Sequence, residues 1–364
     1  MEASLKILMI SSDRKLFEEK SAVSERIKEY GSLVGELHIV IFALKSLGLG
    51  EKQIAPNVWL YPTNSSSRWF YVHDAARIGK AVVFNKKFVR GEALITTQDP
   101  FESGWAALKV KKRWRLPLEV QIHTDPNSPY FSGFLNRIRK IIAKRVLANA
   151  DSVRDVKTLP IYVDKEKIEN AKISFDLHAR FGWRFILLSV SRLTREKNLS
   201  LALKVLAIVI EKFPDSGLVI VGSGPEEANL KYLAKKLGVE NNVAFVGWQD
   251  SLASYYKTAN LYIQMSLFEG YGLSLVEAGL SGLPIVTTPV GLARELEANR
   301  DAYIYPSNRP DLFASGVIDL IENNFKRENL KANLKKTLET KLLSKADYMA
   351  RIKANWERTA SNIK

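Results

Sequence analysis

The chain has 364 residues, 46% hydrophobic and 26% charged, which is typical of a globular protein long enough for two domains. It contains no cysteine, which excludes disulfides, zinc–thiolate centres and a cysteine nucleophile, and its four histidines are too few for a histidine-rich metal cage. The formal net charge is +15, of which residues 1–180 carry +10, so anionic partners are expected.

The first half of the chain alternates strand-like and helix-like segments. Short apolar runs predict buried parallel strands, and longer runs with apolar residues three or four positions apart predict helices. In chain order, we predict strands at 6–11, 37–43, 93–96 and 118–122, and helices at 22–33, 75–89, 101–110 and 134–149. This alternation predicts an α/β domain with a doubly wound parallel sheet.

The second half repeats the alternation. We predict strands at 184–190, 218–221, 243–246, 261–265 and 285–288, and helices at 199–213, 225–237, 250–257, 273–279 and 293–298. No short sequence repeat is visible, so a solenoid is not indicated. Two Rossmann-like domains in one chain follow from the pattern.

The domain boundary is predicted where proline and extended residues interrupt the pattern, between Thr158 and Asp164. At the end of the chain, a charged helical run places Tyr348, Ile352 and Trp356 on one face, which we expect to pack back on the first domain. The predicted divisions are a first Rossmann-like domain at 1–160, a second at 161–345 and a returning helix at 346–364.

No stretch has the length and apolar character of a membrane span or a signal-peptide core. We expect a cytoplasmic protein, and whether it rests on the inner face of the cell membrane stays open.

Two glutamates, Glu269 and Glu277, are the most informative residues of the sequence. A turn with two glycines follows the first, and a helix-forming run surrounds the second. A loop carboxylate and a helix carboxylate at this spacing can face one pocket, and the glycines leave backbone amides bare for a polar ligand. The pair therefore predicts a site for a ligand rich in hydroxyl groups.

Two further loops follow predicted strands of the second half, where open parallel sheets bind ligands. Arg192 and Lys197 lie between a strand and a helix start, a position suited to a diphosphate. Gly222 begins a Gly-Ser-Gly-Pro turn that is neither a Walker loop nor a full dinucleotide fingerprint. A structural turn and a ligand loop both remain open for it.

In the first half, His123 follows a predicted strand, where it can hydrogen-bond a substrate or shuttle a proton. The polar loop at 96–104 follows another strand and is expected to shape the same crevice. Two basic patches, at 109–115 and 137–145, are either anion-binding surfaces or solvated helix faces.

Taken together, these motifs resemble the retaining glycosyltransferases of the GT-B fold, specifically their large family four. The resemblance covers residues 185–325, through Ser189-Val-Ser-Arg-Leu, Val221-Gly-Ser-Gly-Pro, Val246-Gly-Trp, the Glu269–Glu277 segment and Thr288-Pro-Val-Gly. It implies two Rossmann-like domains facing across a cleft, the first (1–160) on the acceptor side and the second (161–345) binding the nucleotide sugar. It also implies transfer of a hexose from a nucleotide diphosphate sugar to a glycan or lipid-linked acceptor. This transfer would retain the anomeric configuration and serve surface polysaccharide synthesis.

The resemblance also implies roles for individual residues. Arg192 and Lys197 would hold the diphosphate, Glu269 the transferred sugar and Glu277 the ribose, while His123 would lie near the sugar and acceptor. The remaining donor-binding positions implied by the family motifs are Gly222, Val246, Gly270, Tyr271, Gly272 and Leu273. No metal or other cofactor is implied.

Two departures from the family pattern lie in the first half. The turn after the first strand, at 11–21, has no glycine, and Lys20 stands where one is usual; the segment at 150–164 is shorter than in the family. Because of these departures, a non-catalytic homologue that binds nucleotide sugars remains an alternative function. A nucleotide-sugar epimerase is a second alternative. No recognisable nucleic-acid module is present, so nucleic acid is not expected as a partner.

Overall fold

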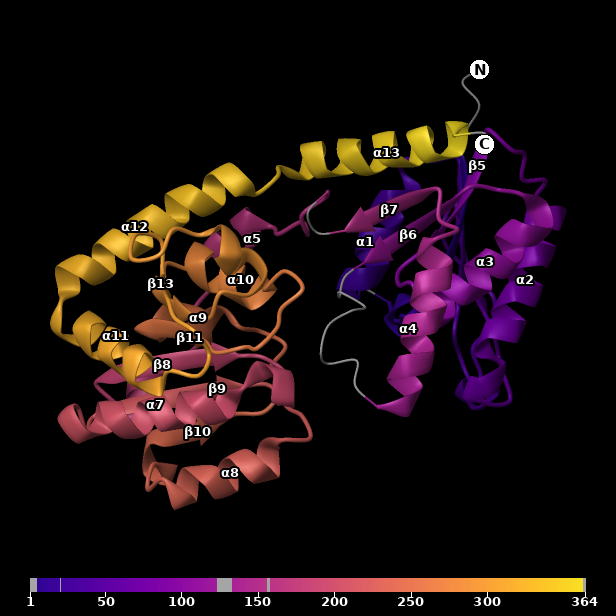
Figure 1. Cartoon of the computed structure of the whole chain (residues 1–364). Helices are drawn as coiled ribbons and strands as arrows, with labels where there is room; N and C mark the ends of the chain where they lie inside the picture. The colour runs from indigo at the N-terminus through magenta and orange to yellow at the C-terminus, as the bar shows by residue number, and fades with distance from the viewer. Residues whose placement is uncertain (1–4, 20, 123–132, 156–157, 363–364) are drawn as a thin grey trace. The chain divides into compact units, whose positions relative to one another are not determined.

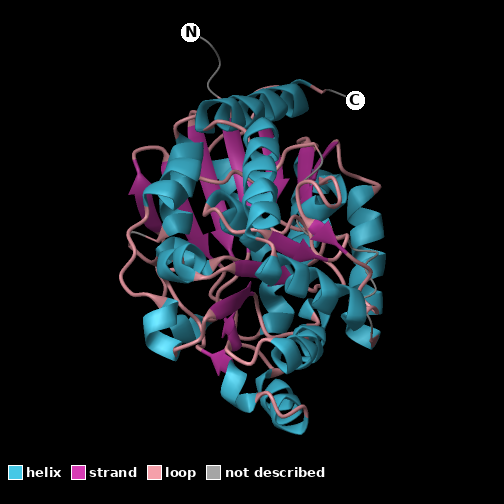
Figure 2. Cartoon of the chain, turned by 90° about the vertical axis from the view of Figure 1, so that its left-hand side faces the viewer, coloured by secondary structure: helices cyan, strands magenta, loops and turns pink. Residues whose placement is uncertain are grey.

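The structure, a computed structural model, describes residues 5–19, 21–122, 133–155 and 158–362. The chain forms two compact units: residues 1–160 together with 344–364, and residues 161–343. Each unit is a mainly parallel sheet with helices on both faces (Figures 1 and 2). The predicted α/β class with two Rossmann-like sheets is confirmed.

The first unit contains a seven-stranded sheet in the order β3-β4-β2-β1-β5-β6-β7, parallel except for the β3–β4 pair. Its strands are β1 (Lys6–Ser11), β2 (Glu36–Ile41), β3 (Lys52–Ala55), β4 (Val58–Pro62), β5 (Ala93–Thr97), β6 (Leu118–Ile122) and β7 (Ser152–Asp155). Its α-helices are α1 (Ala22–Gly31), α2 (Tyr71–Asn85), α3 (Glu102–Trp114), α4 (Phe134–Leu147) and α13 (Lys345–Ser361).

The last helix, α13, packs on β5 and β6 of the first unit, as expected from its apolar face. Leu118 and Val120 pack into the core shared with α2 and α3, so Glu119 between them points to the opposite face. There its carboxylate accepts hydrogen bonds from Trp356 Nε1 at 2.7 Å and from Arg154 Nε at 2.6 Å. A fully buried carboxylate thereby joins α13 to the sheet.

The second unit contains a six-stranded parallel sheet in the order β10-β9-β8-β11-β12-β13. Its strands are β8 (Phe185–Val190), β9 (Ser216–Val221), β10 (Val243–Phe245), β11 (Leu261–Gln264), β12 (Ile285–Thr287) and β13 (Tyr303–Ile304). Its α-helices are α5 (Lys165–Asn170), α6 (Leu177–Phe181), α7 (Leu199–Lys212), α8 (Glu227–Lys236), α9 (Ala253–Thr258), α10 (Leu273–Leu280), α11 (Pro310–Glu322) and α12 (Asn324–Lys341).

Three details differ from the sequence prediction. The terminal helical run is two helices, α12 and α13, with an extended break at Leu342 and a new helix start capped by Ser344. The second unit ends at Leu343, two residues before the predicted 345. The segment predicted as a helix at 293–298 is instead a short 3₁₀ turn, η6 (Gly291–Glu295).

Candidate functional site: the switch point of the second sheet

The strand order of the second sheet reverses between β8 and β11. Chain order proceeds outward from β8 through β9 to β10, and then returns to β11 on the other side of β8. The loops after β8 and β11 therefore separate at their carboxyl ends, which is where doubly wound sheets bind ligands. The predicted donor residues lie mainly in these two loops.

Lys197 and Glu269 meet at this switch point. Lys197 ends a 3₁₀ turn in the loop after β8, and Glu269 lies in the loop after β11. Lys197 Nζ lies 2.8 Å from both carboxylate oxygens of Glu269, and the two side chains are only 14% and 11% exposed. The structure thus brings together a predicted phosphate ligand and a predicted sugar ligand.

Two residues that the sequence prediction missed hold the Glu269 carboxylate. Gln264 Nε2 and Ser266 Oγ each donate to Glu269 Oε1 at 2.7 Å. Gln264 is the last residue of β11 and Ser266 lies two residues beyond it. Polar residues at the carboxyl end of a buried strand were the available signal. Gln264 Oε1 is buried without a hydrogen-bond partner among the described residues, so a polar group of this site remains unused.

Glu277 lies on α10, which begins after Gly272. Its carboxylate accepts a hydrogen bond from Tyr256 OH at 2.9 Å. Burial raises the pKa of Glu277, and the Tyr256 hydrogen bond opposes that rise. Tyr256, on α9, carried no sequence signal for this contact.

The Tyr262 hydroxyl connects the environments of the two glutamates. Burial raises the pKa of Tyr262, and the charges of Glu269 and Glu277 raise it further. The hydroxyl donates to Ser274 Oγ at 2.8 Å, on the first turn of α10. Both carboxylates therefore act on the same hydroxyl, while the shared pocket stays a prediction.

The Gly222 loop after β9 is packed against the loop after β8. Gly222 has φ +130°, and a Cβ atom there would lie 1.9 Å from the carbonyl oxygen of Ser191. Its amide donates to Gly247 O at 2.8 Å, while the amide of Val246 donates to Ile220 O at 3.1 Å. The glycine is thus required by the close approach of two backbones, which gives the turn a structural reason.

The turn at 270–273 is held by the loop after β12. Leu292 N donates to Tyr271 O at 2.7 Å, and a Cβ atom on Gly291 would lie 2.9 Å from Glu269 Cβ. Gly272 precedes α10 with φ +93°, and no side chain caps this helix start. The predicted stretch from Gly270 through Leu273 therefore presents backbone beside Glu269.

Arg192 is placed differently from Lys197. Its side chain is 71% exposed and lies 3.5 Å from Glu196. The structure therefore brings Lys197, but not Arg192, into the contact with Glu269.

The predicted first-domain residue, His123, lies outside the described residues, as does Lys20. The loops after β1 and β5 do meet, through a 2.6 Å hydrogen bond from Ser11 Oγ to Gln98 Oε1. In place of the family's glycine-rich turn, the loop after β1 forms a 3₁₀ turn (Arg14–Phe17) capped by Asp13.

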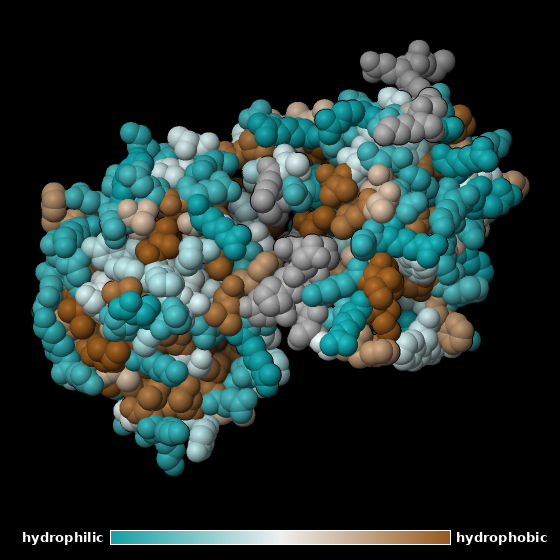
Figure 3. Space-filling view, in the orientation of Figure 1, coloured by the Kyte–Doolittle hydropathy of each residue, from teal (hydrophilic) through white to brown (hydrophobic). Residues whose placement is uncertain are grey.

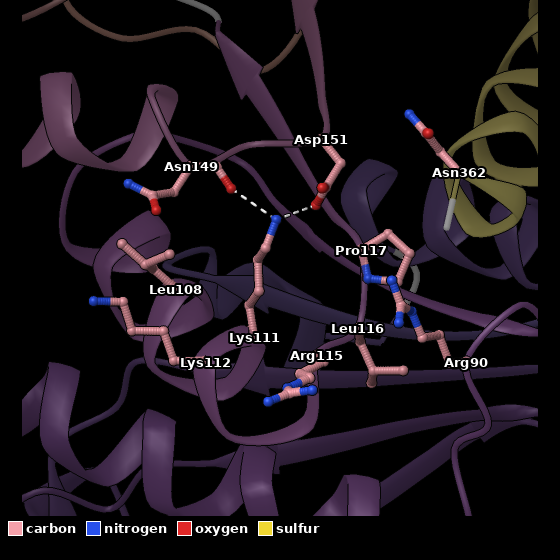
Figure 4. Close-up of a pocket in the computed structure, with 10 residues that line it drawn as sticks. All are labelled: Arg90, Leu108, Lys111, Lys112, Arg115, Leu116, Pro117, Asn149, Asp151 and Asn362. Carbon is pink, nitrogen blue, oxygen red and sulfur yellow. Dashed lines mark hydrogen bonds and ion pairs between the residues drawn. The ribbon is translucent and has the colours of Figure 1, made fainter. Parts of the chain in front are cut away.

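The first basic patch lies at the amino ends of β6 and β7, at the end of the first sheet opposite to the carboxyl ends of its parallel strands. Lys111 bonds to Asn149 O at 2.8 Å and pairs with Asp151, while Lys112 and Arg115 line the same open pocket (Figure 4). Since Lys111 has an acidic partner, part of this patch is explained by packing at the end of α3. Cations there also suit the carboxyl end of a helix.

Comparisons with known proteins show which family the second unit resembles. Residues 174–337 match the sequence model of the family Glycosyl transferases group 1, a span that contains all the second-unit site residues. A Haemophilus influenzae protein described as an uncharacterized glycosyltransferase is 36% identical over 140 residues, 38% of this chain and 39% of that protein. The alpha-monoglucosyldiacylglycerol synthase of Streptococcus pneumoniae is 26% identical over 53% of this chain and 51% of its own length.

A solved structure extends the likeness to both units. Anabaena HepE in complex with UDP and glucose matches with a TM-score of 0.68 at 18% identity, covering 99% of this chain and all of that one. The chain therefore has the GT-B fold, and residues 174–337 are similar to the group 1 glycosyl transferases. The sequence matches span about 39% and 51% of the two curated relatives.

Proposed function

We propose that the protein is a retaining glycosyltransferase that moves a hexose from a nucleotide diphosphate sugar to a glycan or lipid-linked acceptor, without a divalent metal, in surface polysaccharide synthesis. The Lys197–Glu269 contact at the switch point carries this proposal. It sets a fixed cation beside a carboxylate, as an anionic diphosphate next to a sugar requires.

In this proposal the donor replaces the direct ion pair. Lys197, with Arg192 moving from its exposed position, binds the diphosphate and stabilises the charge that develops as the sugar leaves. Glu269, oriented by Gln264 and Ser266, accepts hydrogen bonds from sugar hydroxyls. Glu277 does the same for the ribose, and His123 acts at the acceptor side.

The relatives support the choice of substrates. The pneumococcal relative is named for a glucosylated diacylglycerol, and the HepE structure contains UDP and glucose. We therefore include a lipid-linked acceptor and peripheral contact with an anionic membrane face. No helix in the described part of the chain has the length and apolarity to cross a membrane.

A donor screen tests the proposal. Nucleotide diphosphates and their sugars are compared by thermal shift, because a ligand that binds only the folded state stabilises it by about 2.7 kcal/mol at 100 times its Kd. The donor that binds is then incubated with candidate acceptors in the presence of a chelator, and the product linkage is determined.

Transfer with retention at the anomeric carbon, undiminished by the chelator, supports the proposal. A rearranged nucleotide sugar without acceptor would assign the chain to the epimerases instead. Donor binding without transfer to any acceptor extract would make it a non-catalytic homologue.

A further inference from the structure

Helix α4 of the first unit has an unusual outward face. Phe134, Ile138 and Ile141 are 76%, 41% and 69% exposed, and their spacing of four and three places them on one side of the helix. Leu135 adds a fourth exposed apolar side chain beside them. Figure 3 shows brown side chains over α4, bordered by teal ones.

The opposite side of α4 accounts for the packing of the helix. Ala143 and Val146 are buried, and Val146 and Ile142 join the core that α3 and the sheet share. The exposed apolar residues are therefore not required to attach α4 to its own unit. Singly exposed apolar residues need no explanation, but a row along one helix face indicates a partner.

The residues that flank this row are cationic. Arg137 and Lys144 lie on one border of it, and Lys140 continues the same side. Helix α4 contains no aspartate or glutamate. These three cations make no ion pair with the described residues, whereas Arg139 on the other border is bound to Glu102 at 2.7 Å.

An apolar ridge with unneutralised cations along its border is the pattern of a helix that lies in a membrane interface. The apolar side chains enter the boundary between headgroups and acyl chains, while each lysine or arginine near an anionic surface adds about 1 kcal/mol. Nucleic acid would match the cations but leave the phenylalanine and isoleucines without a role. An acidic protein groove lined by apolar residues would match both features, and binding to protein-free vesicles distinguishes the bilayer from such a partner.

We propose that the outward face of α4, defined by Phe134, Ile138, Ile141, Arg137 and Lys144, docks on an anionic lipid bilayer. This inference rests on the proposed function, because it holds the enzyme at the surface where a lipid-linked acceptor resides. The face belongs to the first unit and the predicted donor-binding residues belong to the second, so docking and donor binding can be measured separately.

Vesicle flotation tests the docking. The full chain is mixed with vesicles of phosphatidylcholine containing 30 mol% phosphatidylglycerol, or of phosphatidylcholine alone, without donor or acceptor. Binding is expected only to the anionic vesicles and should weaken with salt. Replacing Arg137 and Lys144 by glutamine is expected to weaken binding at least tenfold, as is replacing Ile138 and Ile141 by serine.

Matched variants in the second unit separate the local effect from total charge and apolarity. Lys235→Gln with Lys236→Gln on α8 removes the same charge from another exposed helix. Ile173→Ser with Phe325→Ser removes two exposed apolar residues elsewhere. Both should bind vesicles like the parent protein.

The thermal shift with UDP and UDP-glucose is recorded for every variant. Unchanged vesicle binding in both α4 variants would overturn the inference, as would equal losses in the matched variants. If the parent protein does not bind vesicles and the α4 variants lose self-association, the face would be assigned to a second copy of the chain. If the parent does not bind vesicles but binds duplex DNA, and the α4 variants lose that binding, the face would be assigned to nucleic acid. Vesicle binding without a nucleotide shift would retain the docking face and reject the proposed function.

Discussion

Lys197 Nζ lies 2.8 Å from both carboxylate oxygens of Glu269, although the two residues are 72 positions apart in the chain. Each side chain is nearly buried, so each charge is compensated mainly by the other. A diphosphate can bind Lys197 and a sugar can bind Glu269, so donor binding would replace the direct contact between the two side chains.

Removing either partner should abolish sugar transfer while the fold survives. Lys197→Ala and Glu269→Ala are each expected to lower kcat at least 100-fold, because a fixed group opposite developing charge contributes on that scale. The release of nucleotide diphosphate measures the effect. Lys204→Ala, an exposed lysine on α7, serves as the control and should turn over normally; full turnover by either site variant would reject the assignment.

The same pair should be coupled in stability. Either single variant leaves an uncompensated charge at the switch point and is expected to lower the free energy of unfolding by about 1–3 kcal/mol. The double variant Lys197→Ala with Glu269→Ala should be destabilised by less than the sum, which a double-mutant cycle in urea measures. Strict additivity would mean that the two charges do not depend on each other.

The Glu277 carboxylate is expected to lower the folding stability at pH 7 and to increase the affinity for the nucleotide. Because burial raises its folded-state pKa above the unfolded value, the folded state binds more protons in the interval between the two values, and stability falls as pH rises through it. Glu277→Gln is therefore expected to melt higher than the parent at pH 7, with the gain vanishing as the pH falls to about 4.5.

The same substitution should weaken nucleotide binding about 10- to 100-fold, through the loss of a charged acceptor. Calorimetric titration with UDP measures this loss. A variant that is both less stable and equally tight in binding would contradict the ribose assignment.

Gly222→Ala should disrupt the loop that supports the site. The added Cβ atom would overlap the Ser191 carbonyl in a backbone conformation that alanine already disfavours, so we expect a loss of roughly 3 kcal/mol. Gly238→Ala is the matched control, since Gly238 also has positive φ but meets no atom within 4 Å. It should lose only about 1 kcal/mol; equal losses in denaturant would show that the clash has no consequence.

Trp356→Phe should loosen α13 from the first unit. It removes the indole N–H that donates a hydrogen bond to the buried Glu119 carboxylate, and it leaves a smaller ring in a fully buried space. The expected loss in unfolding free energy is about 2–4 kcal/mol. Trp248→Phe, at an exposed position, should change stability by less than about 0.5 kcal/mol. Similar melting curves for the two variants would exclude the proposed role of Trp356.

The periodic elements of both sheets could be predicted because strands buried on both faces are short apolar runs. Strand β3 could not, since Lys52–Ala55 is short, half polar and not fully buried at a sheet edge. Strand β4 was missed although Val58–Pro62 is a mostly buried apolar run. Helix α11 was also missed, although Pro310 at its start is a standard helix signal.

In the site, charge and position were predictable, but partners were not. The loop after β8 identified Lys197 because a cation between a strand and a helix start is a recognisable pattern. That Lys197, rather than Arg192, meets Glu269 depends on how two loops from neighbouring strands turn, which spacing alone does not specify. Tyr256 reaches Glu277 from a separate helix, so only tertiary packing reveals it.

Because α13 is made last but packs on the first unit, the first unit is completed only after the second unit has been synthesised. The ribosome releases all strands of the first sheet long before it makes Trp356, so Glu119 lacks this hydrogen-bond donor until the second unit has been translated. The usual sequence, in which an N-terminal domain folds first and alone, is therefore incomplete for this chain. Any excised version of the first unit should carry α13 grafted onto its end, and a ribosome stalled after residue 343 should display an N-terminal unit still accessible to proteases.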